Sequence, residues 1–251
     1  MYLRRFILAL QFLTVATIRP RLEAEDRDLA GSMAYYPLVG LLLGLALAWA
    51  NRLMFFWPPV LADAVTVALS VVLTRGLHLE GLADTADGLG SGVTTERALE
   101  IMKDSRAGSF AVMAVALDLL LRWAALMALP GSIKFQALIL VPVLSRWAMV
   151  YTVYQSPYAR KDGEGLARPF AEGLTKLHMV VAAFSALAIS VALMWWIGGA
   201  AFLGVSLVAL VVKLYCYGRL GGITGDLLGA LNEVSEILIF LALIAWIGLG
   251  G

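Results

Sequence analysis

The chain has 251 residues, of which 61% are hydrophobic and only 15% charged, and its mean hydropathy is +0.85. A soluble domain is closer to half apolar and a quarter charged, so this composition predicts an integral membrane protein. The net charge of +1 and the lack of a basic face argue against nucleic acid as a partner, and the single Cys216 excludes an internal disulfide.

The first predicted element is the apolar segment 5–18, which begins next to Arg4 and Arg5. No small-residue cleavage site follows this segment, so we do not expect a signal peptide. Its apolar run is also shorter than the roughly 20 residues that a span requires. We therefore expect an N-terminal helix that lies on, or dips into, the membrane interface.

Hydropathy then predicts about seven membrane-spanning helices, and so an all-α polytopic bundle in which residues 1–251 form a single domain. Helices are expected because a backbone in lipid must satisfy its own hydrogen bonds, and the alternating pattern of a barrel is missing. The expected spans are about 34–56, 60–77, 109–129, 133–153, 177–197, 199–217 and 234–250.

Lysine and arginine sort strongly to one side of these spans. Only Arg52 and Lys134 lie toward one side, near the ends of their spans. Fourteen lie in the connections on the other side, which are 1–33, 75–108, 154–176 and 218–233. This asymmetry predicts a cytoplasmic N-terminus. Most acidic residues follow the same distribution, so we expect the chemistry to take place in the cytoplasmic connections 75–108, 154–176 and 218–233.

The most informative motif is HLEGLADTADG at residues 78–88. Glu80, Asp84 and Asp87 lie at i, i+4 and i+7, so a helix places them on one face within about 40°. Three such carboxylates repel one another and are costly near a bilayer, and a divalent cation removes both costs. Carboxylate ligands of this kind suit Mg²⁺ that also binds substrate phosphates. We predict these residues to be metal ligands and catalytic residues.

The same connection contains a glycine-rich turn at 88–92 and a helix that begins after Thr94. Charged residues gather where this helix is expected to end. Asp104 is a candidate further metal ligand, and Lys103 and Arg106 are candidates for holding phosphate oxygens, with Ser105 between them. The alternative interpretation is a solvated charged linker.

A second cluster occupies residues 219–236. Asp226, Glu233 and Glu236 lie at i, i+7 and i+10, on one face of a helix that enters the last span. A glycine turn before a helix N-terminus favours anions, so we expect this cluster to form a second wall of the same site. Its candidate binding residues are Gly221, Gly222, Thr224, Gly225 and Glu233, and Asp226 is a candidate catalytic residue. The alternative is a helix-breaking turn with incidental acids.

Among residues inside the spans, Arg146 most needs a partner, and an anionic substrate or Asp118 would supply one. The alternative for Arg146 is that its side chain reaches out to the interface. Arg122 is four residues from Asp118 and can pair with it along the same helix. The two histidines do not have the spacing of a zinc site.

The runs HLEGLADTADG, LEIMKDSRAGSF and GGITGDLLGALNE, with YYPLVGLLLG and SPYAR, resemble the cobalamin synthase family, the adenosylcobinamide-GDP ribazoletransferases. The resemblance covers essentially the whole chain. It implies an enzyme of the bacterial inner membrane in which α-ribazole, or its 5′-phosphate, displaces GMP from adenosylcobinamide-GDP with the help of Mg²⁺. It leaves the oligomeric state open, and a homo-oligomer is compatible with it.

The resemblance also implies roles for individual residues. Glu80, Asp84 and Asp87 would hold Mg²⁺, or Glu80 would instead accept the proton of the attacking ribose hydroxyl. Phosphate contacts would come from Arg106, Arg146 and Arg160, and Gly221, Gly222, Gly225 and Asp226 would line the nucleotide site or a second metal site. Two positions depart from the family pattern. Glu80 stands where aspartate is expected, and Ile223 stands where a polar residue is common.

Two alternative functions are weaker. The DTADG run also looks like part of the signature of CDP-alcohol phosphatidyltransferases, but the rest of that signature is missing after Gly88. A secondary transporter would place its charges at mid-membrane in paired inverted halves, whereas the acids here lie at the predicted cytoplasmic edge.

Overall fold

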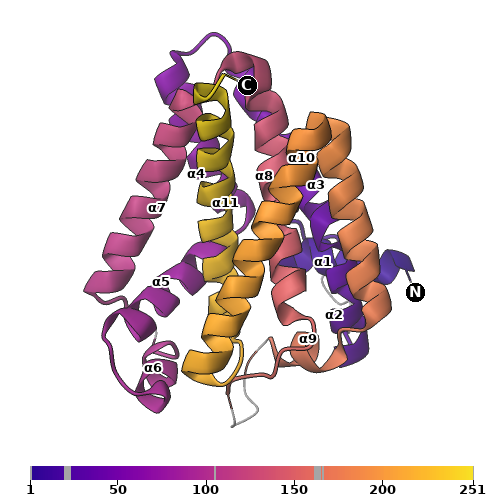
Figure 1. Ribbon diagram of the computed structural model, residues 1–251, viewed down its shortest axis with the longest axis vertical. Coiled ribbons are helices and arrows are strands. Elements are labelled where there is room, and N and C mark those ends of the chain that lie inside the picture. The colour runs from indigo at the N-terminus through magenta and orange to yellow at the C-terminus, as the bar shows by residue number, and fades with distance from the viewer. Residues whose placement is uncertain (1, 20–23, 105, 161–164, 166, 251) are drawn as a thin grey trace.

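The computed structural model describes residues 2–19, 24–104, 106–160, 165 and 167–250, and this part of the chain is helical apart from turns and one isolated bridge (Figure 1). The elements are α1 (Tyr2–Leu13), α2 (Asp26–Ser32), η1 (Met33–Tyr35), α3 (Tyr36–Leu53), α4 (Pro59–Leu73), α5 (Leu77–Gly90), α6 (Thr95–Ile101), α7 (Ser109–Ala128), α8 (Gly131–Val153), α9 (Arg168–Gly173), α10 (Lys176–Leu220) and α11 (Gly225–Gly248). The predicted all-α membrane architecture is confirmed.

Within the described residues, five helices are long and apolar enough to cross a membrane: the stretch Asp26–Leu53, which ends with α3, and α7, α8, α10 and α11. The pair α4 and α5 passes the same test only when taken together, with an 87° bend, which raises the number to six. The predicted count of seven is not confirmed. The expected span at 60–77 becomes the short α4, and the spans expected at 177–197 and 199–217 fall within the single element α10.

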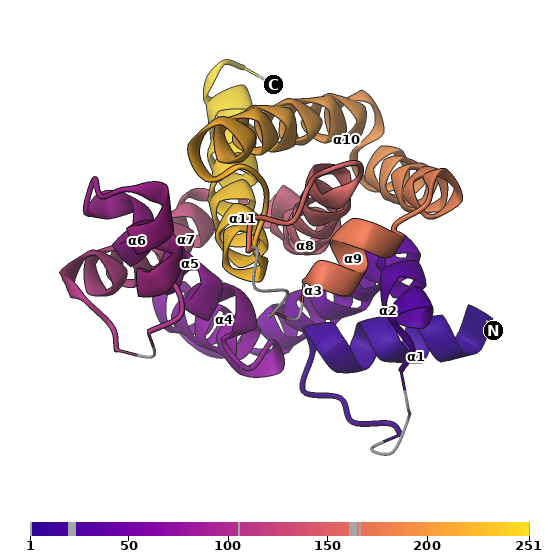
Figure 2. The same cartoon turned by 90° about the horizontal axis from the view of Figure 1, so that it is seen from below.

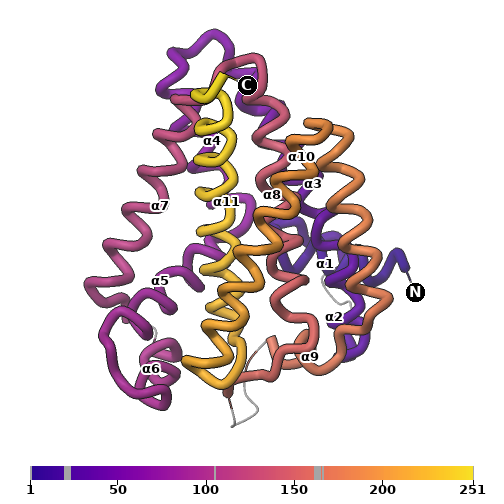
Figure 3. The backbone as a smooth tube through the Cα atoms, in the orientation of Figure 1, coloured from indigo at the N-terminus to yellow at the C-terminus, as the bar shows by residue number. Residues whose placement is uncertain are grey.

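α10 is a hairpin rather than a straight rod. Its backbone leaves the helical region at Met194 and Trp195, and Trp195 has a φ of +49°. Gly198 allows the tight return because a Cβ there would lie 1.8 Å from the carbonyl oxygen of Ser190. The two arms, 176–193 and 196–220, run up and back down the bundle (Figure 3).

α8 is the central helix, with nearly all of its residues from Ala137 to Val153 buried. α3, α10 and α11 pack against it, as the view from below shows (Figure 2). Two glycines bring α3 very close to it. A Cβ on Gly40 would lie 2.3 Å from the Pro142 carbonyl oxygen, and a Cβ on Gly44 would lie 2.6 Å from the Ile139 Cα. Small residues at such crossings are typical of membrane helices, which associate by close packing.

The turn between α4 and α5 directs α5 away from the bundle axis. Arg75 and Gly76 both have positive φ, at 55° and 68°, which costs little for glycine but needs support for arginine. The Arg75 guanidinium donates to the carbonyl oxygen of Gln11 at 2.8 Å, and the Val15 N–H donates to the Leu73 carbonyl oxygen at 2.8 Å. The segment that leaves α1 therefore braces this turn.

The N-terminal helix predicted for 5–18 is present as α1, but it ends five residues earlier, at Leu13. Thr14 bends back on the helix end, where its hydroxyl donates to the Leu10 carbonyl oxygen at 2.6 Å. α1 packs against α2 and α3, and Arg5 is buried beside Asp28, with Nε 3.1 Å from the Asp28 carboxylate. Its contacts with the bundle are thus polar as well as apolar.

The α3–α8 crossing gives a test of the packing. Gly44→Ala should lower the free energy of unfolding by about 1–3 kcal/mol, because the added methyl group has no space against α8. Gly204→Ala on α10 is the matched control, since a Cβ there meets nothing within 4 Å. The measurement is thermal unfolding of the purified protein in detergent. Equal midpoints for the two variants would contradict the close approach of α3 and α8.

Candidate active site

A cavity of about 310 Å³ lies at the end of the bundle where α5, α9 and the start of α11 meet. We call it the carboxylate cavity. Three acids line it, Glu80 and Asp84 from α5 and Asp226 from α11, together with Arg160 and Gly225. Its apolar wall comes mainly from Phe12, Met33, Tyr36, Leu77, Met149, Phe170 and Leu228. The structure therefore brings the first and second predicted clusters to one cavity.

Two glycines allow α5 and α11 to touch. A Cβ on Gly81 would lie 2.7 Å from the Asp226 carbonyl oxygen, and a Cβ on Gly229 would lie 3.0 Å from the His78 carbonyl oxygen. Any larger residue at either position would push the helices apart. This contact sets the separation between the carboxylates of α5 and Asp226.

The cavity has an excess of negative charge. The carboxylate of Asp84 is repelled by the negative charges of Asp226, Glu80 and Asp87. The positive charge of Arg160 offsets part of this repulsion. Arg160 donates from Nη2 to the Asp226 carboxylate at 2.7 Å. One guanidinium cannot neutralise several carboxylates, so the cavity keeps a net negative charge that a divalent cation would neutralise.

Asp87 is used differently from the other two acids on its helix face. Its carboxylate accepts hydrogen bonds from the backbone N–H groups of Gly108, at 2.6 Å, and Ala111, at 2.9 Å. Asp87 thus caps the N-terminus of α7, where a negative charge is favourable. It does not line the carboxylate cavity. Its predicted role as a Mg²⁺ ligand stays a prediction, and the contacts it makes are those of a helix cap.

The described residues contain no group of three or more His, Cys, Asp or Glu side chains arranged to hold a metal ion by themselves. This does not conflict with a Mg²⁺ site of the expected kind. Mg²⁺ is commonly bound by one or two carboxylates, with waters and substrate phosphates completing its shell. The donor chemistry of Glu80, Asp84 and Asp226 fits such an ion.

The segment before Arg160 is positioned by the glycine turn between α10 and α11. Ile223 donates to the Pro157 carbonyl oxygen and accepts from the Ala159 N–H, both at 2.9 Å. Gly222 is required there because a Cβ would lie 2.3 Å from the Pro157 carbonyl oxygen. These two backbone hydrogen bonds hold the segment that places Arg160 at the cavity. Ile223 is buried, and its backbone makes the contacts.

The remaining predicted glycines and Thr224 build the turn itself. Gly221 ends α10 with a φ of +74°, the left-handed conformation that favours glycine. Thr224 begins α11, where its hydroxyl oxygen accepts the Leu227 N–H at 3.3 Å. Only Gly225 of this set lines the carboxylate cavity.

The charged residues after α6 lie outside this cavity. Asp104 and Arg106 form an exposed pair, with Nη2 2.6 Å from the carboxylate oxygen, and these hydrogen bonds lower the pKa of Asp104 to about 2. Lys103 lines a separate cavity beside α6. Ser105 lies outside the described residues.

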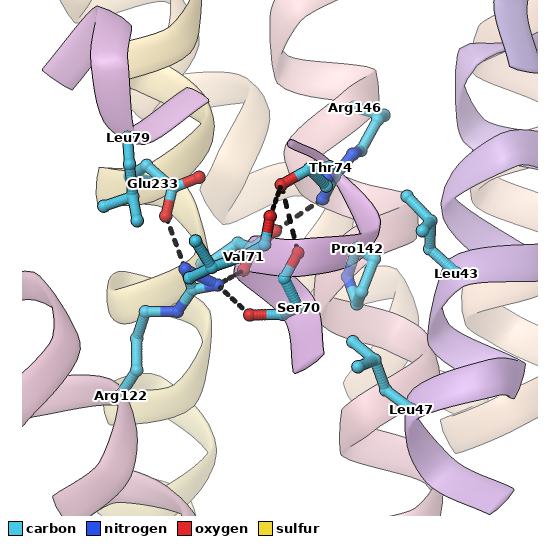
Figure 4. Close-up of a pocket in the computed structure, with 11 residues that line it drawn as sticks. Leu43, Leu47, Ser70, Val71, Thr74, Leu79, Arg122, Pro142, Arg146 and Glu233 are labelled. Atoms are coloured by element: carbon cyan, nitrogen blue, oxygen red, sulfur yellow. Dashed lines mark hydrogen bonds and ion pairs between the residues drawn. The ribbon is translucent and has the colours of Figure 1, made fainter. Parts of the chain in front are cut away.

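Arg146 and Glu233 belong to a buried network of charged residues inside the bundle (Figure 4). Arg122 on α7 contacts the carboxylates of Glu233 at 2.5 Å and Glu236 at 2.6 Å, and Arg146 on α8 contacts Glu236 at 2.5 Å. The expected Arg122–Asp118 pair is longer, at 3.5 Å. Arg146 does not reach out to the interface, and neither Arg146 nor Glu233 lines the carboxylate cavity.

His78 connects this network with the cavity, a position that its spacing from the other histidine did not predict. It is 1% exposed, lines the carboxylate cavity, and lies with Nδ1 3.5 Å from Arg146 Nη2. The sequence signal that could have pointed to His78 is its position in the motif, two residues before Glu80.

The aromatic residues Tyr36 and Phe170 of the cavity wall lie far from every motif acid in the sequence, so no spacing predicted their place in the site.

The fold and the site together define a polytopic membrane protein with a polar, acid-rich cavity at one end of its helical bundle. The sequence model of the cobalamin-5-phosphate synthase family matches residues 5–244, and the chain belongs to this family. It is accordingly a transferase of cobalamin biosynthesis. This result agrees with the resemblance seen in the motifs and goes against the two alternative functions.

Curated relatives match over nearly their full length. The adenosylcobinamide-GDP ribazoletransferase of Syntrophobacter fumaroxidans is 45% identical over 239 residues, which is 93% of this chain and 95% of the relative. The proteins of the same name from Geotalea daltonii and Desulforamulus reducens are 38% and 40% identical, covering 97% and 94% of this chain and 98% and 95% of their own lengths. No solved structure matches the chain.

The buried network gives a test of stability. Arg122→Met should lower the free energy of unfolding by about 3–5 kcal/mol, because it leaves the carboxylates of Glu233 and Asp118 buried without their partner. Adding Glu233→Gln to this variant should restore part of the loss. Arg97→Met is the control, since Arg97 forms an exposed pair with Glu100. Thermal unfolding in detergent measures all three. A double variant less stable than Arg122→Met would contradict this account of the network.

Proposed function

We propose that this protein is a Mg²⁺-dependent transferase that joins α-ribazole, or α-ribazole 5′-phosphate, to adenosylcobinamide-GDP with release of GMP. With α-ribazole, the ribose 5′-oxygen forms a bond to the phosphorus attached to the corrinoid, and the bond from that phosphorus to the GMP oxygen breaks. GMP leaves with the bonding electrons, and the hydroxyl proton passes to a carboxylate. The names of the curated relatives support these substrates.

The single observation that carries the proposal is the carboxylate cavity, which combines three acids with Arg160 and an apolar wall. Phosphoryl transfer needs positioning and charge neutralisation more than covalent catalysis, and this set of residues supplies both. The wall that contains Tyr36 and Phe170 suits the flat, apolar base of α-ribazole. Asp226 holds Arg160 in place by the 2.7 Å hydrogen bond.

The residues then have distinct roles. Asp84 and Asp226 would hold Mg²⁺, with Glu80 as a third ligand or as the acceptor of the hydroxyl proton. Glu80 is the most exposed of the three, which leaves room for an incoming hydroxyl. Arg160 would bind a phosphate oxygen. When bound, Mg²⁺ would neutralise the charge of the pyrophosphate.

The membrane placement is part of the same proposal. The described parts of the connections 75–108, 154–176 and 218–233 lie at one end of the bundle, around the carboxylate cavity (Figure 1). Since these connections and residues 1–33 together carry fourteen of the 19 lysine and arginine residues, we infer that this end faces the cytoplasm across the bacterial inner membrane. The nucleotide substrates are therefore taken from the cytoplasmic side.

A direct assay tests the activity. Membranes that contain the protein should release GMP when adenosylcobinamide-GDP and α-ribazole are both present, and EDTA should abolish the release until Mg²⁺ is added back. GMP is measured by chromatography. Release that continues unchanged in EDTA would refute the dependence on Mg²⁺, and no release with Mg²⁺ present would refute the activity.

Substitutions at the acids test the separate roles. Asp84→Asn and Asp226→Asn should each lower kcat/KM by about 100-fold or more and raise the Mg²⁺ concentration needed for half-maximal rate, because each removes charge from the cation site. Asp87→Asn should lower thermal stability more than it alters the Mg²⁺ dependence. Asp26→Asn, at an exposed position on α2, is the control. Full Mg²⁺-dependent activity of Asp84→Asn would show the assignment to be wrong.

A further inference from the structure

A second cavity, of about 480 Å³, lies between α6 and the C-terminal end of α10. We call it the α6–α10 cavity. The residues that could bind a polar ligand in it are Glu96, Glu100 and Lys103, from α6 and the residues after it, and Tyr217 and Arg219 from α10. Arg160 lines this cavity too, and it also lines the carboxylate cavity. The two cavities therefore share a guanidinium.

The walls of the α6–α10 cavity are fixed by the fold. The Thr95 hydroxyl donates to the Arg219 carbonyl oxygen at 2.9 Å, and the Arg219 guanidinium donates to the Val93 carbonyl oxygen. Beneath these bonds lies a small apolar cluster, separate from the main core, that includes Met102 and Cys216. α6 is thus a packed element against α10, which differs from the solvated linker considered for this connection.

We propose that the α6–α10 cavity binds the guanosine phosphate portion of the substrate and holds it as the leaving GMP. This inference rests on the proposed function. Guanine presents two adjacent N–H donors, N1–H and the 2-amino group, which a carboxylate accepts in parallel. Glu96 or Glu100 supplies that carboxylate. Glu100 is now paired with Arg97 at 2.9 Å, and an exposed pair of this kind is easily given up.

The other lining residues suit the rest of a nucleotide. Tyr217 is 63% exposed, which leaves its ring accessible for a base to stack on. Lys103 and Arg219 bring positive charge to the same cavity, where a phosphate would lie. Adenine has a donor in its 6-amino group but an acceptor at N1, so it cannot make the parallel pair of hydrogen bonds with a carboxylate, and the cavity should distinguish the two bases.

Arg160 determines how the two cavities work together. Its Nη2 is bound to Asp226, while its Nε, which is also buried, has no hydrogen-bond acceptor among the described residues. A buried N–H group normally has a partner, so this donor indicates a ligand oxygen at the junction. A phosphate oxygen there would place the pyrophosphate between the cavities, with the bond to be broken beside the carboxylates and guanosine beside α6.

Equilibrium binding tests the inference without turnover. The full chain in lipid nanodiscs, with Mg²⁺, is titrated with GMP, AMP and inorganic phosphate by calorimetry. We expect GMP to bind at least tenfold more tightly than AMP or phosphate. Glu96→Gln combined with Glu100→Gln should remove this preference, and Tyr217→Ala should weaken GMP and AMP alike. Glu25→Gln, at an exposed position on the chain before α2, is the matched control and should bind GMP as the unaltered chain does.

Two results would overturn the inference: equal binding of GMP and AMP by the unaltered chain, which a general phosphate or lipid headgroup site would give, or unchanged GMP selectivity in the double variant. The altered acids are exposed, so the fold should be kept, and an unchanged thermal midpoint verifies this. Failure of the GMP-release assay would instead refute the proposed function, because binding does not depend on catalysis.

Discussion

The ion pairs of Arg122 and Arg146 with Glu233 and Glu236 are the constraint on which the rest of the structure depends. A charged side chain inside a membrane bundle is tolerated only with its counter-charge at close range, and here the pairs join α7, α8 and α11 at one level. Helices tied in this way cannot slide or rotate independently. The position of α11 in turn fixes α5 through the Gly81–Gly229 contact. The carboxylate cavity therefore takes its geometry from charges that do not themselves line it.

Much of the fold could be predicted because lipid imposes simple rules on composition and length. The helical class, the separate spans at α7, α8 and α11, and the site-bearing connections follow from hydropathy and charge alone. The two arms of the α10 hairpin match the spans expected at 177–197 and 199–217, but the exact place of its turn and the 87° turn after α4 could not be predicted in the same way. Their geometry depends on backbone dihedral angles at Trp195 and Arg75, residues with no intrinsic preference for positive φ.

The site shows where helical spacing stops being informative. Spacing correctly places Glu80, Asp84 and Asp87 on one helix, but it does not say which neighbour each side chain will meet. Asp87 accepts hydrogen bonds from the first amides of α7, and Glu233 pairs with Arg122. Spacing does not predict these contacts because the partners are distant in the sequence. Asp226 meets the α5 acids for the same reason, and the sequence offered only the shared side of the membrane as a hint. His78 is a further case, since it lies within the predicted motif but its contact with Arg146 comes from a distant helix and could not be predicted.

The brace between α1 and the α4–α5 turn changes how the N-terminus of this protein should be regarded. A short apolar helix at the start of a membrane protein is easily taken for a passive anchor. Here Gln11, in the last turn of this helix, accepts a hydrogen bond from Arg75, and Phe12 forms part of the cavity wall. The two ends of this contact, Gln11 and Arg75, are 64 residues apart in the chain. A change near the end of α1 would therefore act on the direction of α5, and through it on the position of the acids that line the cavity.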